Sequence, residues 1–548
     1  MEKRVISFVL SICLCFCVLA FRLYDLTLNN EKVQQTAVSR QKYTLTLKDE
    51  RGIIYDRNYE KLVDDEWVNI AMVDPLRCNS DSGYFLKNNS LDMTYEEISK
   101  KLSRERPFIT QVKEYKNDFP GVKIYNSTMR YSSQMILSHL IGYCDSDGNG
   151  ISGIEKAFDE ELKTFGGKTT VSFLVDAKRK ALGGSEIEIN KTSNGIGGIV
   201  LTIDKNIQMA AEKAIDKKIT KGAVVVSDIK TGEILALVSR PNYNQNNVKE
   251  YIDREDAPFV NRCFNNYNLG SVFKICVVAA ALENHVPTTF EVDCKGYVEV
   301  SGRQFGCHEE KGHGIVSLET AFKESCNPYF IELCKRTGAE KVISMAKKLG
   351  FGEENIFWGG ISSKKGNLPN KKTYSPHESA NISIGQGEIL VTPIQVNSMI
   401  STIAGNGIYR LPVLFKGITK DGENITMKAP QCEKYNILDP SISAKIKQLM
   451  INTVKDGSGR KASPEYLGAG GKTASAQTGQ FKNDEEIIRT WFAGFYPEKD
   501  PMYAITVVSD DDGKSGATIC APVFKEICDS IFKLYYKDTT TEISKESE

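Results

Sequence analysis

The sequence carries no excess of charge of either sign. Among its 548 residues, Lys and Arg together number 70, and Asp and Glu together also number 70. A strongly basic balance would favour a nucleic-acid partner, and this composition gives no support for one. The 14 cysteines do not form a disulfide-scaffold pattern in a chain of this length. We therefore expect most of them to be small buried residues.

Long apolar runs are scarce, and the one that stands out covers residues 5–21, directly after Lys3 and Arg4. Two further apolar residues extend it past Arg22, whose long side chain can reach the membrane interface. A cleaved signal peptide is the alternative, but no cleavage site with two small residues follows the run. Because basic residues stay on the cytoplasmic side, we expect residues 1–25 to form a cytoplasmic stub and a single membrane anchor, with the bulk of the chain outside the cell membrane.

The chain is too long for one ordinary core, so we expect two or three domains. Residues 40–200 are rich in strand patterns and contain no cluster of potential ligands, which favours a non-catalytic module. Residues 204–219 then place apolar side chains at helical spacing. Strand patterns follow at 223–226 and 234–238, joined by a turn. This order predicts an α+β domain with an antiparallel sheet.

Residues 268–283 predict a buried helix. From Ser271 onward no Gly or Pro interrupts the segment, and apolar residues fill nearly every face. Gly270 gives the backbone freedom for a sharp entry. Ser271 then falls in the first turn, where backbone N–H groups are unpaired and the helix dipole is positive. Lys274 lies on the same face. A serine beside a desolvated lysine can act as a nucleophile with a built-in base.

A Ser-x-x-Lys pair alone is weak support, since six other such pairs occur in the chain. Taken singly, Ser271 is better explained as a helix-capping serine. Two further motifs change this interpretation. Ser-Cys-Asn at 325–327 begins 325 − 271 = 54 residues later, and Lys-Thr-Ala-Ser at 472–475 begins 472 − 325 = 147 residues after that.

In order and spacing these motifs resemble the Ser-x-x-Lys, Ser-x-Asn and Lys-Thr-Gly motifs of the penicillin-recognising serine transpeptidases. The segments at 51–58 and 153–155 resemble class B penicillin-binding proteins in particular, and the likeness runs from about residue 45 to 533. Further segments whose sequence is similar to that usual in the family lie at 230–236, 239–243, 385–393 and 491–495.

The resemblance implies a role for each motif residue. Ser271 Oγ would attack the carbonyl of a terminal D-alanyl–D-alanine and form an acyl-enzyme. Lys274, whose charge is disfavoured by burial and by a second nearby lysine, would accept the serine proton. Ser325 would relay a proton to the leaving amine. Asn327 would hold the peptide amide.

The third motif would bind the substrate. Lys472 would supply positive charge and Thr473 a hydroxyl for the substrate carboxylate. The N–H groups of Ser271 and Ser475 would form the oxyanion hole. Each role has a plainer alternative: Lys472 as a solvated strand residue, or Ser325 as a helix cap.

The chain departs from the family pattern at two positions. Leu269 stands where Pro is usual, and Ala474 stands where the third motif usually has Gly. On a strand, Ala474 shares a face with Lys472 while Thr473 and Ser475 share the other, so its methyl group need not displace a backbone donor. We expect crowding to cost at most about 1.4 kcal/mol, or tenfold in acylation rate.

Cys294 and Cys307 bracket an apparent hairpin at 295–306. Outside the membrane a disulfide between them is one interpretation. Another adds His308 and His313 to form a zinc site, although the spacing lacks the usual close Cys pair. Free buried thiols are the third. We expect neither a metal ion nor a cofactor.

Together these features predict a membrane-anchored class B penicillin-binding protein, a D,D-transpeptidase that cross-links peptidoglycan stem peptides and is acylated by β-lactams. The expected parts are a pedestal or dimerisation domain at 40–200, a transpeptidase domain at 205–535 and a polar tail at 536–548. No glycosyltransferase domain fits before residue 200, so the resemblance implies a polytopic membrane glycosyltransferase as partner. A β-lactam sensor, or an impaired member that acts by binding, remains as an alternative, and Ala474 favours the latter.

Overall fold

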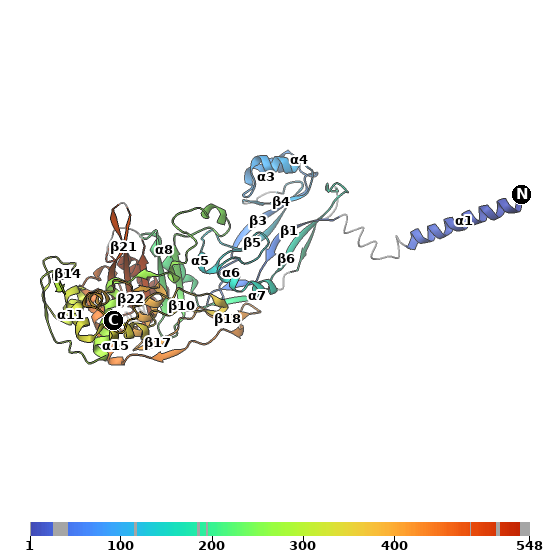
Figure 1. Ribbon diagram of the computed structural model, residues 1–548. Coiled ribbons are helices and arrows are strands. Elements are labelled where there is room, and N and C mark those ends of the chain that lie inside the picture. The colour runs from blue at the N-terminus through green and yellow to red at the C-terminus, as the bar shows by residue number, and fades with distance from the viewer. Residues whose placement is uncertain are drawn as a thin grey trace, which may run out of the picture. The chain divides into compact units, whose positions relative to one another are not determined.

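The computed structural model (Figure 1) describes residues 2–25, 42–113, 118–182, 187–192, 195–482, 484–510 and 516–537. Beyond residue 537 the expected polar tail lies outside the described residues. The chain divides into two compact units. The first comprises Met1–Arg51, Asp64–Arg130 and Lys163–Gly195, and the second comprises Gly52–Val63, Tyr131–Leu162 and Ile196–Glu548. The domain limits drawn from the sequence stay predictions.

The N-terminal helix α1 spans Glu2–Tyr24, and its apolar side chains are exposed. Its residues Lys3–Tyr24 form a helix long and apolar enough to cross a membrane. At 1.5 Å per residue, 22 residues extend about 33 Å, which matches a hydrocarbon core of about 30 Å. The helix therefore fits the single anchor that the sequence predicts.

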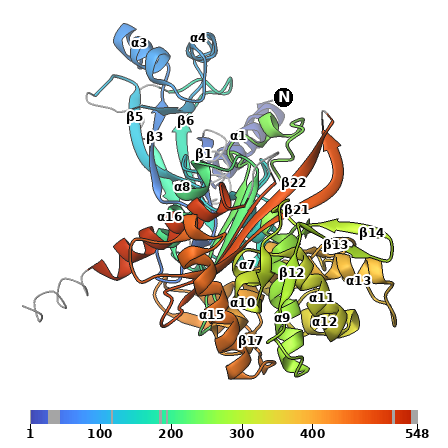
Figure 2. The ribbon, with the colours of Figure 1, turned by 90° about the vertical axis from the view of Figure 1, so that its left-hand side faces the viewer.

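Two antiparallel sheets form the first unit (Figure 2). The unit has two apolar cores, and strand β3 contributes to both because its side chains alternate between the two faces. Ile70 and Met72 pack against the other sheet, whereas Ala71 and Val73 pack against two helices. One sheet has the order β1 (Lys42–Glu50), β6 (Gly167–Leu174), β7 (Glu188–Lys191). The other has β4 (Phe108–Val112), β3 (Glu66–Val73), β5 (Val122–Met129), with α3 (Ser80–Asn89) and α4 (Tyr95–Ser103) packed on it.

A five-stranded antiparallel sheet forms the centre of the second unit. Its order is β10 (Ile234–Arg240), β9 (Gly222–Asp228), β23 (Tyr503–Ser509), β22 (Glu485–Tyr496), β21 (Gly470–Lys482). The β9–β10 hairpin is the one that the sequence predicts. Strand β21 lies at the edge of the sheet, so one side of its backbone is available to a ligand.

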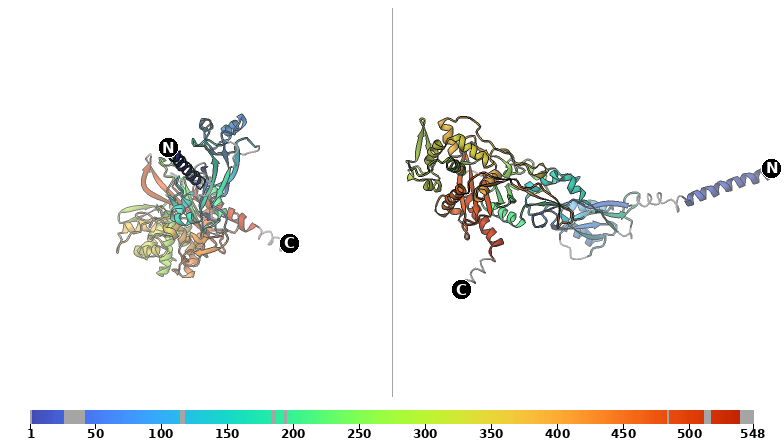
Figure 3. Two further views of the ribbon diagram at one scale, coloured as in Figure 1. Left: turned by 90° about the vertical axis from the view of Figure 1, so that its right-hand side faces the viewer. Right: turned by 90° about the horizontal axis from the view of Figure 1, so that it is seen from below.

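Helices cover both faces of this sheet, which confirms the predicted α+β class. Helices α8 (Lys205–Asp216) and α16 (Cys520–Tyr535, red in Figure 3) share one core with the strands. Helix α14 (Pro393–Ala404) packs on β9 and β23. Asn397 on α14 donates hydrogen bonds from Nδ2 to the carbonyl oxygens of Val225 (3.1 Å) and Ala504 (2.9 Å), which fixes this helix against the strands.

A smaller sheet joins distant parts of the second unit. Its order is β19 (Ile425–Lys428), β18 (Phe415–Thr419), β8 (Gly198–Leu201), β2 (Ile53–Tyr55), and β2 pairs with β8 in parallel. The class B segment at 51–58 thus forms a strand and turn inside the second unit, although the sequence analysis placed it in the pedestal. The unit also contains α5 (Ser138–Ile141), α6 (Gly153–Ala157), the larger part of α7 (Asp159–Thr164), β11 (Tyr267–Asn268), β16 (Leu390–Val391), β17 (Ile408–Arg410), β20 (Lys434–Asn436) and α15 (Pro440–Asp456).

The buried helix predicted from Ser271 begins three residues later. A 3₁₀ turn, η4 (Gly270–Phe273), leads into α9 (Lys274–Glu283), whose first eight residues are buried. Helices α11 (Asn327–Thr337), α12 (Ala339–Lys348) and α15 pack against it, and α10 (Leu318–Lys323) and α13 (Pro376–Ser383) pack on α11. Two small hairpins complete the region, β12 (Val292–Cys294) with β15 (Gly314–Val316), and β13 (Tyr297–Val300) with β14 (Arg303–Gly306).

Candidate active site

Two glycines bring Ser271 against the edge strand β21. The Gly270 N–H donates to the Gly385 carbonyl oxygen (3.0 Å), and a Cβ on Gly385 would lie 2.1 Å from the Gly270 oxygen. Gly270 has φ +64°, and a Cβ there would lie 3.2 Å from both the Ser475 oxygen and the Ala476 Cβ. Only residues without side chains allow these three backbone segments to approach so closely. Ser271 is therefore held beside the third motif.

The Lys274 amine holds the second motif. Its Nζ donates to the Ser325 carbonyl oxygen (2.7 Å), to Ser325 Oγ (3.2 Å) and to Asn327 Oδ1 (2.8 Å). The same nitrogen lies 5.1 Å from the ring centre of Phe330. Lys274 is fully buried, and this desolvation lowers the pKa of its amine to about 7. Near neutral pH a large share of the amine is thus uncharged and able to accept a proton.

A strained turn sets the second motif in place. Ser325 has φ +59°, a left-handed conformation that costs a residue with a side chain about 1–2 kcal/mol. Helix α11 then begins at Asn327, with Pro328 in its first turn, where a missing N–H does no harm. The Asn327 amide is fixed at both ends, because its Nδ2 donates to the Gly306 carbonyl oxygen (2.9 Å) while its Oδ1 accepts from Lys274.

The third motif lies on β21. Lys472 is fully buried, and desolvation together with the charge of Lys274 lowers its pKa well below the ordinary value. Its Nζ lies 5.8 Å from the ring centre of Phe322 and donates to the Thr473 oxygen (3.4 Å). Thr473 Oγ1 donates to Ser458 Oγ (3.2 Å). Ser458 has no motif that would mark it in the sequence, since a serine following a helix is too common to stand out.

Side chains alternate along β21 as the sequence analysis expects. Ser475 is exposed, whereas Ala474 is only 4% exposed and Ala476 is buried. Ala474 pairs directly with Trp491 on β22, and directly opposed residues share a face of the sheet. The Ala474 methyl group therefore packs into the sheet's core side.

A cleft of about 770 Å³ opens over these motifs. Ser271, Asn327 and Ser475 all line it, so one residue from each motif reaches the same space. The other lining residues come mainly from three places: the β13–β14 hairpin and the residues after it (303–308), the α13 region (381, 384, 386 and 387) and the far end of β21 (477–479). A cleft with convergent polar groups is the usual form of an active site.

The remaining predicted site residues lie behind this surface. Lys274 and Ser325 do not line the cleft, and neither do Lys472, Thr473 and Ala474. Within the described part of the chain, no hydrogen bond joins Ser271 to Lys274 or to Lys472. The structure thus unites Lys274 with the second motif directly and brings Ser271 to them through the shared cleft.

Such an arrangement suits acyl transfer. A serine at the start of a helix faces a cleft, and a buried amine with a lowered pKa lies one turn away on the same element. The edge strand beside the serine offers backbone donors of the kind that stabilise an oxyanion.

Comparison with known proteins identifies the protein family to which the chain belongs. The family profile described as "Penicillin binding protein transpeptidase domain" matches residues 222–529, and that described as "Penicillin-binding Protein dimerisation domain" matches residues 46–198. The chain belongs to the penicillin-binding protein transpeptidase family, as the motifs predicted.

Particular relatives support this assignment. Stage V sporulation protein D of Bacillus subtilis is 30% identical, over 97% of this chain and 86% of the relative. The peptidoglycan D,D-transpeptidase MrdA of Acinetobacter baumannii is 26% identical, over 93% of this chain and 85% of the relative. The peptidoglycan D,D-transpeptidase FtsI of Escherichia coli is also 26% identical, over 88% of this chain and 83% of the relative.

Solved structures share the fold. One chain of a peptidoglycan synthase complex superposes with a TM-score of 0.68 at 20% identity, over 97% of this chain and 99% of that one. The D,D-transpeptidase domain of a peptidoglycan glycosyltransferase from Eggerthella lenta has a TM-score of 0.64 at 21% identity, over 89% and 99%. At these identities the likeness concerns the fold alone.

Proposed function

We propose that the protein is a peptidoglycan D,D-transpeptidase that forms a serine acyl-enzyme with stem peptides and is acylated by β-lactams. The observation that carries this proposal is the contact of the buried Lys274 amine with Ser325 and Asn327, directly behind a cleft that Asn327 and Ser271 line. Relatives across nearly the whole chain are named for the same activity.

Ser271 is the nucleophile. Its Oγ attacks the D-alanyl carbonyl and expels the terminal D-alanine, and the acyl group then passes to the amine of a second stem peptide. Lys274 takes the serine proton, which its lowered pKa permits at neutral pH. Ser325, in hydrogen-bond contact with the same amine, passes a proton to the leaving nitrogen.

Substrate is held from both sides of the cleft. Asn327, already fixed at both ends of its amide, binds the peptide amide. The backbone N–H groups of Ser271 and Ser475 form the oxyanion hole. Lys472 provides positive charge behind the strand, and Thr473 a hydroxyl for the substrate carboxylate.

The anchor and the partner complete the proposal. Helix α1 crosses the cell membrane once, and the bulk of the chain is extracytoplasmic. Residues 40–200 serve as the non-catalytic pedestal and residues 205–535 as the transpeptidase domain. A polytopic membrane glycosyltransferase supplies the glycan strands that this enzyme cross-links. A solved chain with a similar fold belongs to a peptidoglycan synthase complex, which supports a partner of this kind.

Labelling with a fluorescent penicillin tests the nucleophile. The full chain in membranes is expected to label covalently, and Ser271→Ala is expected to abolish the label. Ser344→Ala is the matched control, because Ser344 begins another Ser-x-x-Lys pair on α12 but is exposed and does not line the cleft. A label that persists in Ser271→Ala, or that maps to Ser325, would refute the assignment.

A further inference from the structure

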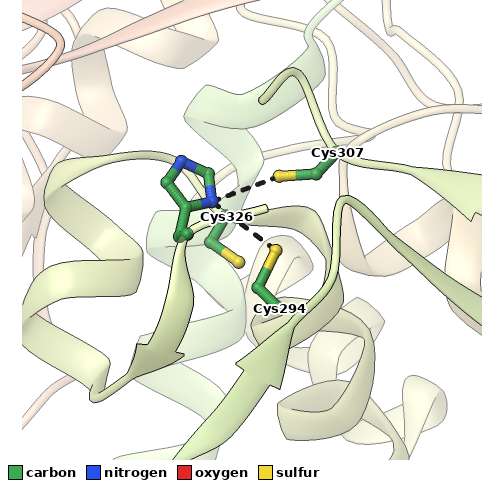
Figure 4. Close-up of side chains that lie close together, drawn as sticks. Cys294, Cys307 and Cys326 are labelled. Atoms are coloured by element: carbon green, nitrogen blue, oxygen red, sulfur yellow. Dashed lines mark hydrogen bonds between the residues drawn. The ribbon is translucent and has the colours of Figure 1, made fainter. Parts of the chain in front are cut away.

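Three cysteines and a histidine converge beside the second motif (Figure 4). Cys294 ends strand β12, and Cys307 directly follows β14. His313 directly precedes β15, and Cys326 is the middle residue of the Ser-Cys-Asn motif. Four separate segments thus deliver one ligand atom each to the same place.

The two nitrogen–sulfur distances match a tetrahedral zinc site. The four ligand atoms all lie within 4.8 Å of one another. Nδ1 of His313 lies 3.6 Å from Cys294 Sγ and 3.5 Å from Cys307 Sγ. Tetrahedral bonds of about 2.3 Å to sulfur and about 2.0–2.1 Å to nitrogen place sulfur and nitrogen about 3.5–3.6 Å apart. One ring nitrogen has a single hydrogen or a single lone pair, so hydrogen bonding alone does not explain two equal contacts.

The donor set indicates the metal. Cys294 and Cys326 are fully buried, Cys307 is 9% exposed and His313 is half-buried. Thiolate sulfur and imidazole nitrogen in a tetrahedral arrangement favour zinc over the hard cations. We propose that these four residues bind one Zn²⁺ in a closed site, with all four positions taken by protein.

The backbone around the cluster is built for this arrangement. Gly312 has φ +82°, and a Cβ there would lie 1.9 Å from the Cys294 carbonyl oxygen, so the loop carrying His313 passes directly over β12. The Cys307 N–H donates to the Gly296 oxygen (2.8 Å). The β13–β14 hairpin and the β12–β15 pair have only two strands each, and the hairpin packs in a small apolar cluster with residues of α11 and α13. A metal bound by all four segments would fix these short strand pairs relative to one another.

A disulfide accounts for less of the arrangement. It would use two of the three sulfurs and leave the third, together with the imidazole, without a role. All fourteen cysteines are free thiols in the structure. The disulfide between Cys294 and Cys307 and the expected absence of a metal are therefore not the interpretations that we favour.

The cluster also corrects the ligand set considered from the sequence. His308 Nδ1 lies 4.0 Å from Cys307 Sγ and is not part of the four-residue cluster. Cys326 takes its place. It lies too far along the chain, and inside too familiar a motif, for its spacing to suggest a ligand.

The metal ties the second motif to the wall of the cleft. Cys326 lies between Ser325 and Asn327, the two residues that hold the Lys274 amine. Cys307 continues the β13–β14 hairpin, which lines the cleft. Zinc is thus a positioning element for the active site, and this consequence for acylation rests on the proposed function, whereas metal binding itself does not.

Metal content tests the site without reference to activity. The full chain, purified in detergent without chelator, is expected to contain one zinc per chain by elemental mass spectrometry. Cobalt in its place should show charge-transfer bands of cobalt–thiolate bonds and the intense d–d bands of a tetrahedral site. Metal-free protein that stays metal-free after zinc is added, or three thiols found partly as a disulfide by alkylation mapping, would overturn the proposal.

Matched variants test the ligands. His313→Ala and Cys294→Ser are expected to lose the zinc. His308→Ala is expected to keep it, and so is Cys334→Ser, because Cys334 is a buried thiol on α11 outside the cluster. Zinc retained in His313→Ala, or lost equally in His308→Ala, would contradict the ligand set. The cobalt spectrum of the unaltered chain decides the matter where a variant fails to fold.

The positioning role has its own measurement. Chelation of the unaltered chain should lower the penicillin acylation rate about tenfold to a hundredfold, since small displacements of reacting groups cost this much, and added zinc should restore it. An equal rate with and without metal would remove the positioning role. Zinc-loaded chain that does not acylate at all would instead refute the proposed function and leave the metal site standing.

Discussion

Replacing Ala474 by Gly restores the residue usual in the third motif, and the structure sets the size of the effect. The Ala474 methyl group is 4% exposed, lies opposite Trp491 in the sheet and does not line the cleft. Its removal therefore opens no space for the substrate. We expect the acylation rate of Ala474→Gly to stay within about tenfold of the unaltered protein, a difference of about 1.4 kcal/mol in activation free energy.

Stability should change more clearly than rate. Exposing or deleting one buried CH₂-sized group costs about 0.8 kcal/mol, and Gly inside a strand costs a further 0.5–1 kcal/mol or so relative to Ala. The expected loss is therefore about 1.3–1.8 kcal/mol. For a domain of this size, with an unfolding entropy of about 2.1 cal/mol/K per residue, that corresponds to a decrease in Tm of roughly 2–3 °C.

The assay compares both proteins in second-order acylation by one penicillin and in thermal unfolding. Ala504→Gly is the control, because Ala504 is also buried in the same sheet, on β23, which β22 separates from β21, and it does not line the cleft. It should show a similar loss of stability and no change of rate. Unaltered protein that fails to acylate, beside an Ala474→Gly variant that acylates readily, would refute the reasoning and favour an impaired protein that acts by binding.

Two other perturbations follow from the site. Burial lowers the pKa of Lys274 to about 7, so below that pH the neutral amine is the minor form. The acylation rate should therefore rise about tenfold per pH unit up to about pH 7 and then level off. A rate independent of pH from about 5 to 9 would contradict a lysine base. Gly385→Ala should reduce acylation at least about tenfold, because its Cβ would meet the Gly270 oxygen at 2.1 Å and displace the turn before Ser271. Gly360→Ala is the matched control, since Gly360 also has positive φ but meets nothing within 4 Å and does not line this cleft, and an equal loss in both variants would show backbone strain rather than displacement.

Much of this protein could be predicted from local sequence. The apolar run at the N-terminus, the buried helix after Gly270 and the hairpin of β9 and β10 depend on side chains close together in the chain, and their periodicity is visible without a structure. The three motifs could be recognised because their residue types and order resemble a known family. Even the face on which Ala474 lies follows from strand alternation.

Tertiary structure decided what depends on contacts between distant segments. The Lys274 amine meets Ser325 and Asn327 only because α9 packs against α11, and its pKa falls because that packing excludes water. The segment at 52–63 pairs with β8, more than a hundred residues away, and so belongs to the second unit.

The cysteine cluster shows the same limit most clearly. Cys294, Cys307, His313 and Cys326 have no close pair in sequence, and each alone looks like a small buried residue or a loop histidine. Sequence periodicity reports which face of an element is apolar, but it carries no information about which loops the packed helices and hairpins bring within a few ångströms. That convergence is set by the fold as a whole, and it is what turns three scattered thiols and an imidazole into a candidate zinc site beside the catalytic motif.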